Sequence, residues 1–306
     1  MSKEYTDLQL LHELEPVVET AINRHMRMRK DWNPHDYIPW SDGKNYYALG
    51  GQDWEPGQSK LSEVAQTAMV QNLLTEDNLP SYHREIATRF SRDGAWRTWI
   101  GQWTAEEGRH SIALRDYLVV TRGVDPVALE RLRMEHTVAG YDAGERSALS
   151  VLAYVSFQEL ATRVSHRNTG RASGCPLADQ LLARIATDEN LHMVFYRNLM
   201  AAALDIAPDD AMVAIRDEVI NFAMPGLGMA DFAKNALTIA KAGIYDLRIH
   251  HDDVLVPVLR FWNIFDRNDF GPVGEKAREE LVGFLGLLDE RARFYEEKRK
   301  LAAVAG

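Results

Sequence analysis

Cysteine is almost absent from this sequence: Cys175 is the single thiol among 306 residues. One cysteine excludes an intramolecular disulfide and also a cysteine-ligated iron–sulfur cluster, which takes about four thiolates. Any redox chemistry must therefore draw its electrons from another protein or from a diffusible donor. The chain also lacks an apolar run of the about 18 residues needed to cross a bilayer, and its acidic, amphipathic N-terminus has no signal-peptide layout. These absences predict a cytoplasmic protein that is not transmembrane.

Positive charge is in deficit. The chain has 35 Lys and Arg against 45 Asp and Glu, which gives a net charge of −10 and a pI near 5.5. Such a balance argues against nucleic-acid binding, which needs a basic face. One local exception is "NRHMRMRK" (residues 23–30), which contains His25 and four fixed positive charges: Arg24, Arg27, Arg29 and Lys30. We interpret it as a docking patch for an acidic partner; the alternative is an ordinary solvated helix end.

Strand signals are also poor, because no alternating run of β-branched residues is bounded by turns. Apolar residues at helical spacing instead predict an all-α protein. The expected helices cover 60–79, 96–120, 147–168, 176–204, 209–223, 229–242 and 273–303, with a long aromatic-rich loop at 31–58 and a short break at 223–229. We predict one domain over 1–306: an N-terminal helix and arm (1–58), a metal-binding four-helix core (60–204) and additional C-terminal helices (205–306).

Two Glu-x-x-His pairs stand out, Glu107 with His110 and Glu189 with His192. At positions i and i+3 of a helix, both side chains lie on one face and can reach ions held at one site. A chain with ten histidines produces such pairs by chance, so the pairs alone are a weak signal, and surface charges on amphipathic helices are the plain alternative.

Two further glutamates, Glu76 and Glu159, lie in unusually apolar helices, where an unpaired carboxylate is costly to bury. Glu107 follows Glu76 by 31 residues, and Glu189 follows Glu159 by 30. Each interval suits an antiparallel helix hairpin, and two hairpins with one long crossover form a bundle of the carboxylate-bridged two-metal class. The predicted ligands are therefore Glu76, Glu107, His110, Glu159, Glu189 and His192, a set that suits iron or manganese. Glu106 and Asp188, each directly before a ligand glutamate, are expected to hold the second nitrogens of the histidines across the bundle.

Longer motifs surround these residues: "WNPHDYIPW" (32–40), "LLTEDNLPSY" (73–82), "WTAEEGRH" (103–110), "YVSFQELATRVSHRNTG" (154–170) and "DENLH" (188–192). On these motifs the sequence resembles the soluble acyl-[acyl-carrier-protein] desaturases, most closely their actinobacterial branch, over about residues 5–270. The resemblance implies a ferritin-like diiron fold with the same six ligands. It also implies that Thr162 lies on the oxygen-binding side and that Trp32, His110 and Asp188 form an electron route. The alternatives are a helix hydroxyl bonded to its own backbone for Thr162, and packing under the arm for Trp32.

The activity implied by this resemblance is oxygen-dependent insertion of a cis double bond into a fatty acyl chain on acyl carrier protein, in fatty acid biosynthesis. The resemblance also implies two iron ions, O₂ as oxidant, an external ferredoxin-type electron donor and a homodimer, with Arg24–Lys30 as the candidate site for the carrier protein. Two departures are Gly108, where the family has Asn, and Asn190–Leu191, where plant members have basic residues. Another diiron oxidase or hydroxylase, an iron-storage protein and a non-catalytic acyl-binding protein stay open as alternatives. A ribonucleotide reductase radical subunit typically has Asp where Glu76 stands. No pattern indicates the acyl chain length or the position of the double bond.

Overall fold

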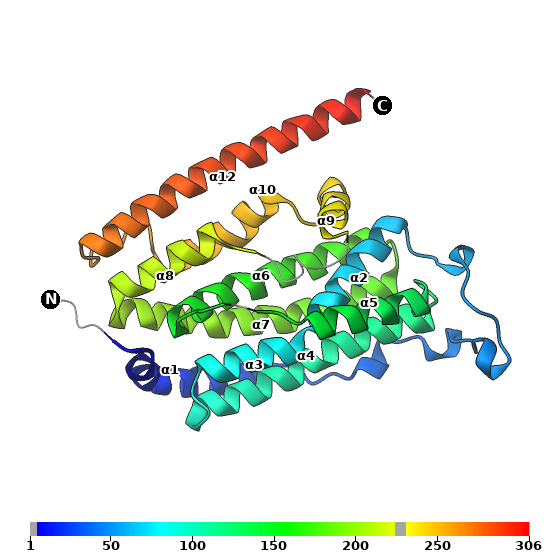
Figure 1. Cartoon of the computed structure of the whole chain (residues 1–306), viewed down its shortest axis with the longest axis horizontal. Coiled ribbons are helices and arrows are strands. Elements are labelled where there is room, and N and C mark those ends of the chain that lie inside the picture. The colour runs from blue at the N-terminus through cyan, green and yellow to red at the C-terminus, as the bar shows by residue number, and fades with distance from the viewer. Residues whose placement is uncertain (1–4, 143, 224–230, 306) are drawn as a thin grey trace.

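The computed structural model describes residues 5–142, 144–223 and 231–305, with side chains described as far as Leu301. Over these ranges the chain forms helices and turns without a strand, which confirms the expected all-α class. Figure 1 shows the long helices stacked in layers, and the principal ones are α1 (Asp7–Met28), α2 (Glu63–Asp77), α3 (Leu79–Arg89), α4 (Gly94–Val120), α5 (Pro126–Ala139), α6 (Ala148–Ala172), α7 (Pro176–Ile206), α8 (Pro208–Ile220), α9 (Phe232–Lys241) and α12 (Pro272–Ala305).

A four-helix core consists of α2, α4, α6 and α7, in which α6 lies along α7 and α2 contacts both α4 and α6. Local sequence fixes where these helices begin. The Ser62 hydroxyl accepts from the backbone N–H of Ala65 at the start of α2, and Ser147 caps α6 in the same way. Pro176 occupies the first position of α7, where a missing N–H costs nothing.

The connection from α2 to α4 differs from the expected simple hairpin. The helix predicted over 60–79 ends at Asp77, and α3 begins directly at Leu79. Pro80 explains the break, because proline lacks a backbone N–H and is tolerated only in the first turn of a helix. Glu76 therefore lies in the last turn of α2 instead of midway along a longer helix.

The helix α5 lies between the two hairpins, in the long crossover. It was not expected from periodicity, and the reason is that only Leu129 of this helix is buried. A helix that buries so little has no apolar stripe that a sequence pattern can detect.

The N-terminal region covers one side of the core. The helix α1 begins with a capping box between Thr6 and Gln9 and packs against α4 and α7. The arm that follows contains four short 3₁₀ turns, Pro34–Asp36, Trp40–Asp42, Tyr47–Leu49 and Pro56–Gln58. Arg122 holds this arm, because its buried guanidinium donates to Gln58 Oε1 and to backbone oxygens of the arm.

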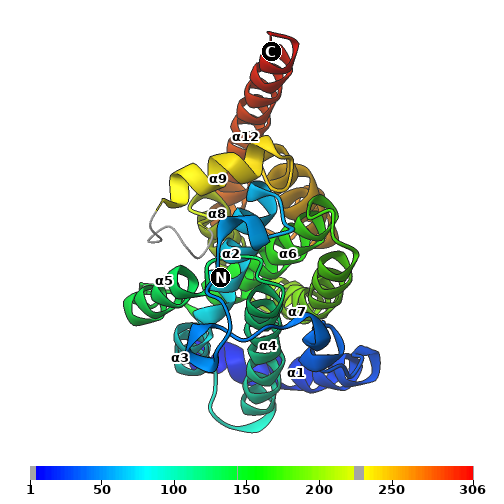
Figure 2. The same cartoon turned by 90° about the vertical axis from the view of Figure 1, so that its right-hand side faces the viewer.

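The C-terminal helices cover the opposite side. The helix α8 contacts both α6 and α12, so it lies between the core and α12 (Figure 2). Three short segments join α9 to α12: α10 (Leu247–Ile249), the π-helical turn His250–Leu255, and α11 (Val256–Phe261). They were not predicted. The break expected at 223–229 lies, after Ala223, outside the described residues.

Candidate metal centre

All six predicted ligands lie together inside the four-helix core. Their ligating atoms form two groups, and within each group the atoms lie within 4.8 Å of one another. One group is Glu76, Glu107, His110 and Glu189; the other is Glu107, Glu159, Glu189 and His192. Glu107 and Glu189 belong to both groups, while each group has one histidine and one glutamate of its own. This is the arrangement that two adjacent cations with two bridging carboxylates require.

The histidine nitrogens face the carboxylates in a way that suits a metal. His110 Nδ1 lies 3.0 Å from Glu189 Oε1 and 3.3 Å from Glu107 Oε2, and His192 Nδ1 lies 2.7 Å from Glu107 Oε1. None of these contacts has hydrogen-bond geometry. Both Nδ1 atoms, Glu107 Oε1 and Glu189 Oε1 are buried without a hydrogen-bond partner among the described residues. Because buried polar atoms are almost always paired, these atoms fit cation ligands.

Four buried carboxylates also create a charge problem. Burial and the neighbouring Glu189 raise the pKa of Glu107, and burial raises the pKa of Glu159 well above its usual range. Burial alone would raise the pKa of Glu76 as well, but the neighbouring His110 and the hydrogen bond to His166 hold it below its usual range. Two divalent cations would offset the four negative charges, so the donor set fits a dinuclear site of oxygen and imidazole ligands.

His192 is held on its outer side by Glu106. His192 Nε2 lies 3.0 Å from Glu106 Oε2, and the same carboxylate is 2.8 Å from His25 Nε2 and accepts from Gln102 Nε2 at 2.6 Å. Burial alone would raise the pKa of Glu106, but the hydrogen bonds from His192 and His25 hold it below its usual range. His25, Glu106 and His192 also bring three ligating atoms within 4.8 Å. Since hydrogen bonds already join these atoms, we do not assign a third metal there.

His110 faces Asp188 on its outer side. Its Nε2 lies 3.6 Å from Asp188 Oδ2, which is longer than a hydrogen bond. Asp188 accepts instead from Trp32 Nε1 at 2.6 Å and from Arg184. Burial would raise the pKa of Asp188, but His110 and Arg184 lower it to about 2. The structure thus brings Trp32, Asp188 and His110 together, as the resemblance implied. The Trp32 and His110 rings are stacked, with their centroids 6.3 Å apart. Their part in electron transfer stays a prediction.

The Thr162 hydroxyl contacts its own helix, as the alternative expected, and also a carboxylate shared by both groups, while a part in oxygen binding stays a prediction. Its Oγ1 lies 3.1 Å from the backbone oxygen of Gln158, 3.0 Å from that of Glu159 and 3.0 Å from Glu189 Oε2. A hydroxyl has one proton, so it donates to one of these acceptors at a time. Thr162 is therefore placed to exchange between its own helix and a shared carboxylate.

Three supporting residues were not assigned from the sequence. His166 Nε2 lies 2.8 Å from Glu76 Oε1, and Asn72 lies 3.3 Å from the other nitrogen of that ring. The Trp103 indole donates to Glu159 Oε1 at 3.0 Å. His166 follows Glu159 by seven residues, two helical turns on the same face, and this spacing was the available signal.

His25 is a further supporting residue, and its sequence interpretation was wrong. It was placed in the basic surface patch, yet it is 4% exposed and bonded to Glu106. The reason is that His25 continues the buried stripe of α1 after Val18 and Ala21.

Arg24, Arg27 and Lys30 are exposed, so they form the surface part of the predicted patch. Arg29 is only half-exposed, and its guanidinium lies 3.1 Å from Asp31 and 3.6 Å from Glu106. Met26 and Met28, 42% and 59% exposed, lie between the free positive charges. The surface patch is thus three cations mixed with two apolar side chains.

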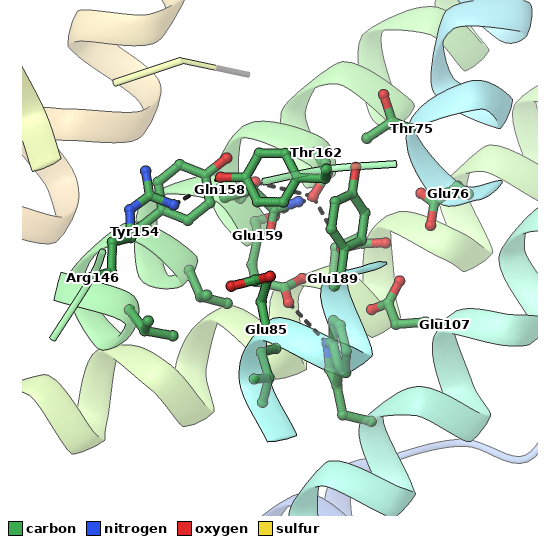
Figure 3. Close-up of a pocket in the computed structure, with 16 residues that line it drawn as sticks. Thr75, Glu76, Glu85, Glu107, Arg146, Tyr154, Gln158, Glu159, Thr162 and Glu189 are labelled. Carbon is green, nitrogen blue, oxygen red and sulfur yellow. Dashed lines mark hydrogen bonds between the residues drawn. The ribbon is translucent and has the colours of Figure 1, made fainter. Parts of the chain in front are cut away.

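A cavity lies beside the carboxylates (Figure 3). In Figure 3, Glu76 and Glu107 lie at one side of the view and Arg146 at the other. The lining residues come from α2, α3, α4, α6 and α7 and from the connection before α6: Thr75, Glu76, Tyr82, Glu85, Ile86, Trp103, Glu107, Tyr141, Arg146, Val151, Tyr154, Val155, Gln158, Glu159, Thr162 and Glu189.

Among the described residues, no helix is both long and apolar enough to cross a membrane.

A family model described as "Fatty acid desaturase" matches residues 6–304. The chain is 61% identical over 290 residues to a Mycobacterium tuberculosis protein named "Putative acyl-[acyl-carrier-protein] desaturase DesA1", covering 92% of this chain and 86% of the relative. It is 29% identical to palmitoyl-[acyl-carrier-protein] 4-desaturase 2 of Ophrys sphegodes, covering 89% and 77%. The crystal structure of DesA2 from M. tuberculosis superposes with a TM-score of 0.74 at 32% identity, covering 88% of this chain and 98% of that one.

Proposed function

This chain belongs to the fatty acid desaturase family, and from this premise we propose that it is an acyl-ACP desaturase, where ACP is acyl carrier protein. The reaction removes one hydrogen from each of two adjacent methylenes and leaves a cis double bond. The acyl chain gives up two electrons and two protons. An external donor supplies two more electrons and the solvent supplies two more protons, so that O₂ is reduced to two waters. The names of the mycobacterial and plant relatives support this substrate class.

We assign the metal as a pair of iron ions. Glu76 and His110 would hold one ion, Glu159 and His192 the other, and Glu107 and Glu189 would bridge them. The observation that carries this assignment is the sharing of two carboxylates between two groups whose histidine Nδ1 atoms have no other partner among the described residues. When bound, the iron would supply the activation of O₂ and the oxidising power that breaks the C–H bonds.

The protein itself contributes a shaped, dry slot. Val151 and Val155 of α6 and Trp103 of α4 line the cavity, and Glu159 lies one turn beyond Val155. An acyl chain lying along these side chains would present one C–C pair to the carboxylates, since the walls fix its position along the slot. Holding the reacting atoms in place in this way removes much of the entropic part of the barrier.

Electron supply and assembly complete the proposal. A ferredoxin-type donor would deliver electrons near Trp32, whose indole reaches Asp188 beside His110. The homodimer and the cytoplasmic location stay predictions. Arg24, Arg27 and Lys30 would capture the carrier, because a chain of net charge −10 needs a local basic patch to attract an acidic partner.

The decisive experiment supplies reduced, iron-loaded protein, O₂ and acyl-ACP and searches for an alkene by mass spectrometry. The wild type should bind about two iron ions and produce the alkene, as expected for a two-metal site. Glu189→Ala should lose both, because it removes a shared carboxylate. Glu63→Ala, on the exposed first turn of α2, should behave as the wild type. A hydroxylated product would indicate a hydroxylase, and iron uptake far above two ions without product would indicate storage.

A further inference from the structure

At the end of the cavity away from the metal residues the lining becomes charged. Six residues of α6 line the cavity, and four of them follow one face of the helix, from Thr162 and Glu159 through Val155 to Val151. Val151 precedes Glu159 by eight residues, or about 12 Å along the helix. Beyond it, just before the Ser147 cap of α6, the lining changes from valine to Arg146.

Arg146 is brought there by a connection that α3 holds in place. Arg84 of α3 donates to the backbone oxygen of Tyr141 at 3.3 Å, and Arg89 donates to that of Gly144 at 2.9 Å. Gly140 permits the close approach, because its φ is +67° and a Cβ there would lie 2.9 Å from the Ser81 hydroxyl. The position of Arg146 therefore depends on specific contacts of the residues that precede it.

The Arg146 guanidinium is fully engaged by protein groups. It donates to the Tyr141 hydroxyl at 2.7 Å, lies 3.1 Å from Glu218 Oε2 of α8, and stacks over the Tyr154 ring at 4.0 Å. Tyr154 in turn donates to the backbone oxygen of Ala223. The side chains of Arg146 and Glu218 are 18% and 9% exposed. Because each charge already has its partner, this cluster is suited to closing the cavity and not to binding a polar ligand.

We propose that the Arg146–Glu218 pair is the terminal wall of the acyl slot and limits how many carbons can lie beyond the metal residues. This inference rests on the proposed desaturase function. A methyl end that advanced further would separate the pair and leave Glu218 buried without its cation, which is strongly unfavourable. Acyl chains up to the wall gain apolar contact with each added methylene, and longer ones lose it.

The test is a chain-length profile of the double variant Arg146→Ala/Glu218→Ala, which removes both charges and leaves neither unpaired. With acyl-ACP substrates that differ by two carbons, the kcat/KM optimum should move to longer chains. The ratio of long to short substrate should rise at least about tenfold, the smallest discrimination expected for one methylene in an apolar pocket. Arg216→Ala/Glu280→Ala is the matched control, because it removes an α8–α12 ion pair away from the cavity and should leave the profile unchanged.

A second variant acts in the opposite direction. Val151→Phe keeps the wall and narrows the slot before it, so the optimum should move to shorter chains. It also provides a test if the double variant does not fold. An unchanged profile in a folded double variant, or a shift toward longer chains in Val151→Phe, would overturn the proposal.

Binding separates this proposal from the assigned reaction. Displacement of a fluorescent fatty acid from metal-free protein, by fatty acids of graded length, needs no turnover. If the wild type makes no alkene but the double variant still prefers longer fatty acids than the wild type, the reaction is wrong and the wall is right. If the wild type makes the alkene and neither profile shifts, the wall is wrong and the reaction stands.

Discussion

The two histidines of the candidate metal centre face carboxylates from the opposite helix, but those carboxylates are held in different ways. Glu106 lies within hydrogen-bond distance of His192, His25 and Gln102. Asp188 accepts from Trp32 and Arg184, and His110 stays 3.6 Å away. His192 thus has a fixed outer hydrogen bond, while the outer side of His110 faces a carboxylate whose charge arginine already balances. One acid sets the orientation of its histidine, and the other is part of a charged network that reaches Trp32.

The N-terminal segment contributes to both networks. His25 of α1 reaches Glu106, and Trp32, just beyond the end of α1, reaches Asp188. The outer face of the same segment presents Arg24, Arg27 and Lys30. The segment 24–32 therefore contacts both networks beside the candidate metal centre with its buried side chains, and its exposed side chains face the proposed carrier.

The largest expected effect concerns stability without metal. Asp188→Ala leaves Arg184, which is 8% exposed, without its counter-charge, and losing one partner of a buried pair costs about 3–5 kcal/mol. Glu106→Ala should cost less, about 1–3 kcal/mol, because it leaves two imidazoles and an amide, and not a buried guanidinium, without their acceptor. Urea unfolding of the metal-free variants measures both. Asp179→Ala, which breaks the more exposed pair with Arg167, is the control and should cost about 0–1 kcal/mol. Equal losses at Asp188 and Glu106 would contradict the comparison.

Iron affinity should fall more in the Glu106 variant than in the Asp188 variant, which is the reverse of the order expected for stability. Glu106→Gln keeps the shape but removes the charge that holds His192 Nε2, and loss of such a supporting group typically weakens metal binding about 10–100-fold. One of the two ions should be affected, since His192 belongs to one group only. Asp188→Asn should weaken binding less, because its contact to His110 is long. Titration with ferrous iron followed by calorimetry resolves the two sites. A larger loss in Asp188→Asn would show that the 3.6 Å separation closes when metal binds.

Substitution of Trp32 should change the rate of electron transfer more than the iron content. Trp32→Phe keeps an aromatic ring over His110 but removes the N–H that reaches Asp188. We expect unchanged iron content and a reduction by the donor protein that is about tenfold slower, equivalent to about 1.4 kcal/mol of barrier. Stopped-flow absorbance of the ferric protein measures it. Trp262→Phe is the matched control, because that indole donates to the backbone of Arg197 away from this route. Equal reduction rates in Trp32→Phe and Trp262→Phe would mean that Trp32 has a packing role alone.

The sequence could predict that the six side chains meet, because they obey helix periodicity. Glu107 and His110, and Glu189 and His192, share a face through their three-residue spacing. Glu106 reaches His192 as expected, whereas Asp188 faces His110 at 3.6 Å without a hydrogen bond. What could not be predicted depends on contacts between distant segments. Nothing local to His25 indicates Glu106, 81 residues away. Arg146 lies in a connection without periodicity, and its role appears only when α3, α6 and α8 are in place.

The smallest effect on the molecule itself is expected on the outer face of the N-terminal segment. Reversing Arg27 and Lys30 to Glu changes two exposed surface side chains, so stability should change by about 0.5 kcal/mol or less. Capture of an acidic carrier should suffer: KM rises while kcat stays nearly constant, the pattern of lost uniform binding. The defect should shrink at high salt, because exposed charges are screened over about 8–10 Å near physiological ionic strength. Lys298→Glu/Lys300→Glu makes the same change in net charge on the exposed C-terminal part of α12 and separates a local patch from overall repulsion. An equal rise in KM in both double variants would mean that net charge alone matters. An unchanged KM at low salt in Arg27→Glu/Lys30→Glu would move the carrier site elsewhere, while the metal assignment would stand.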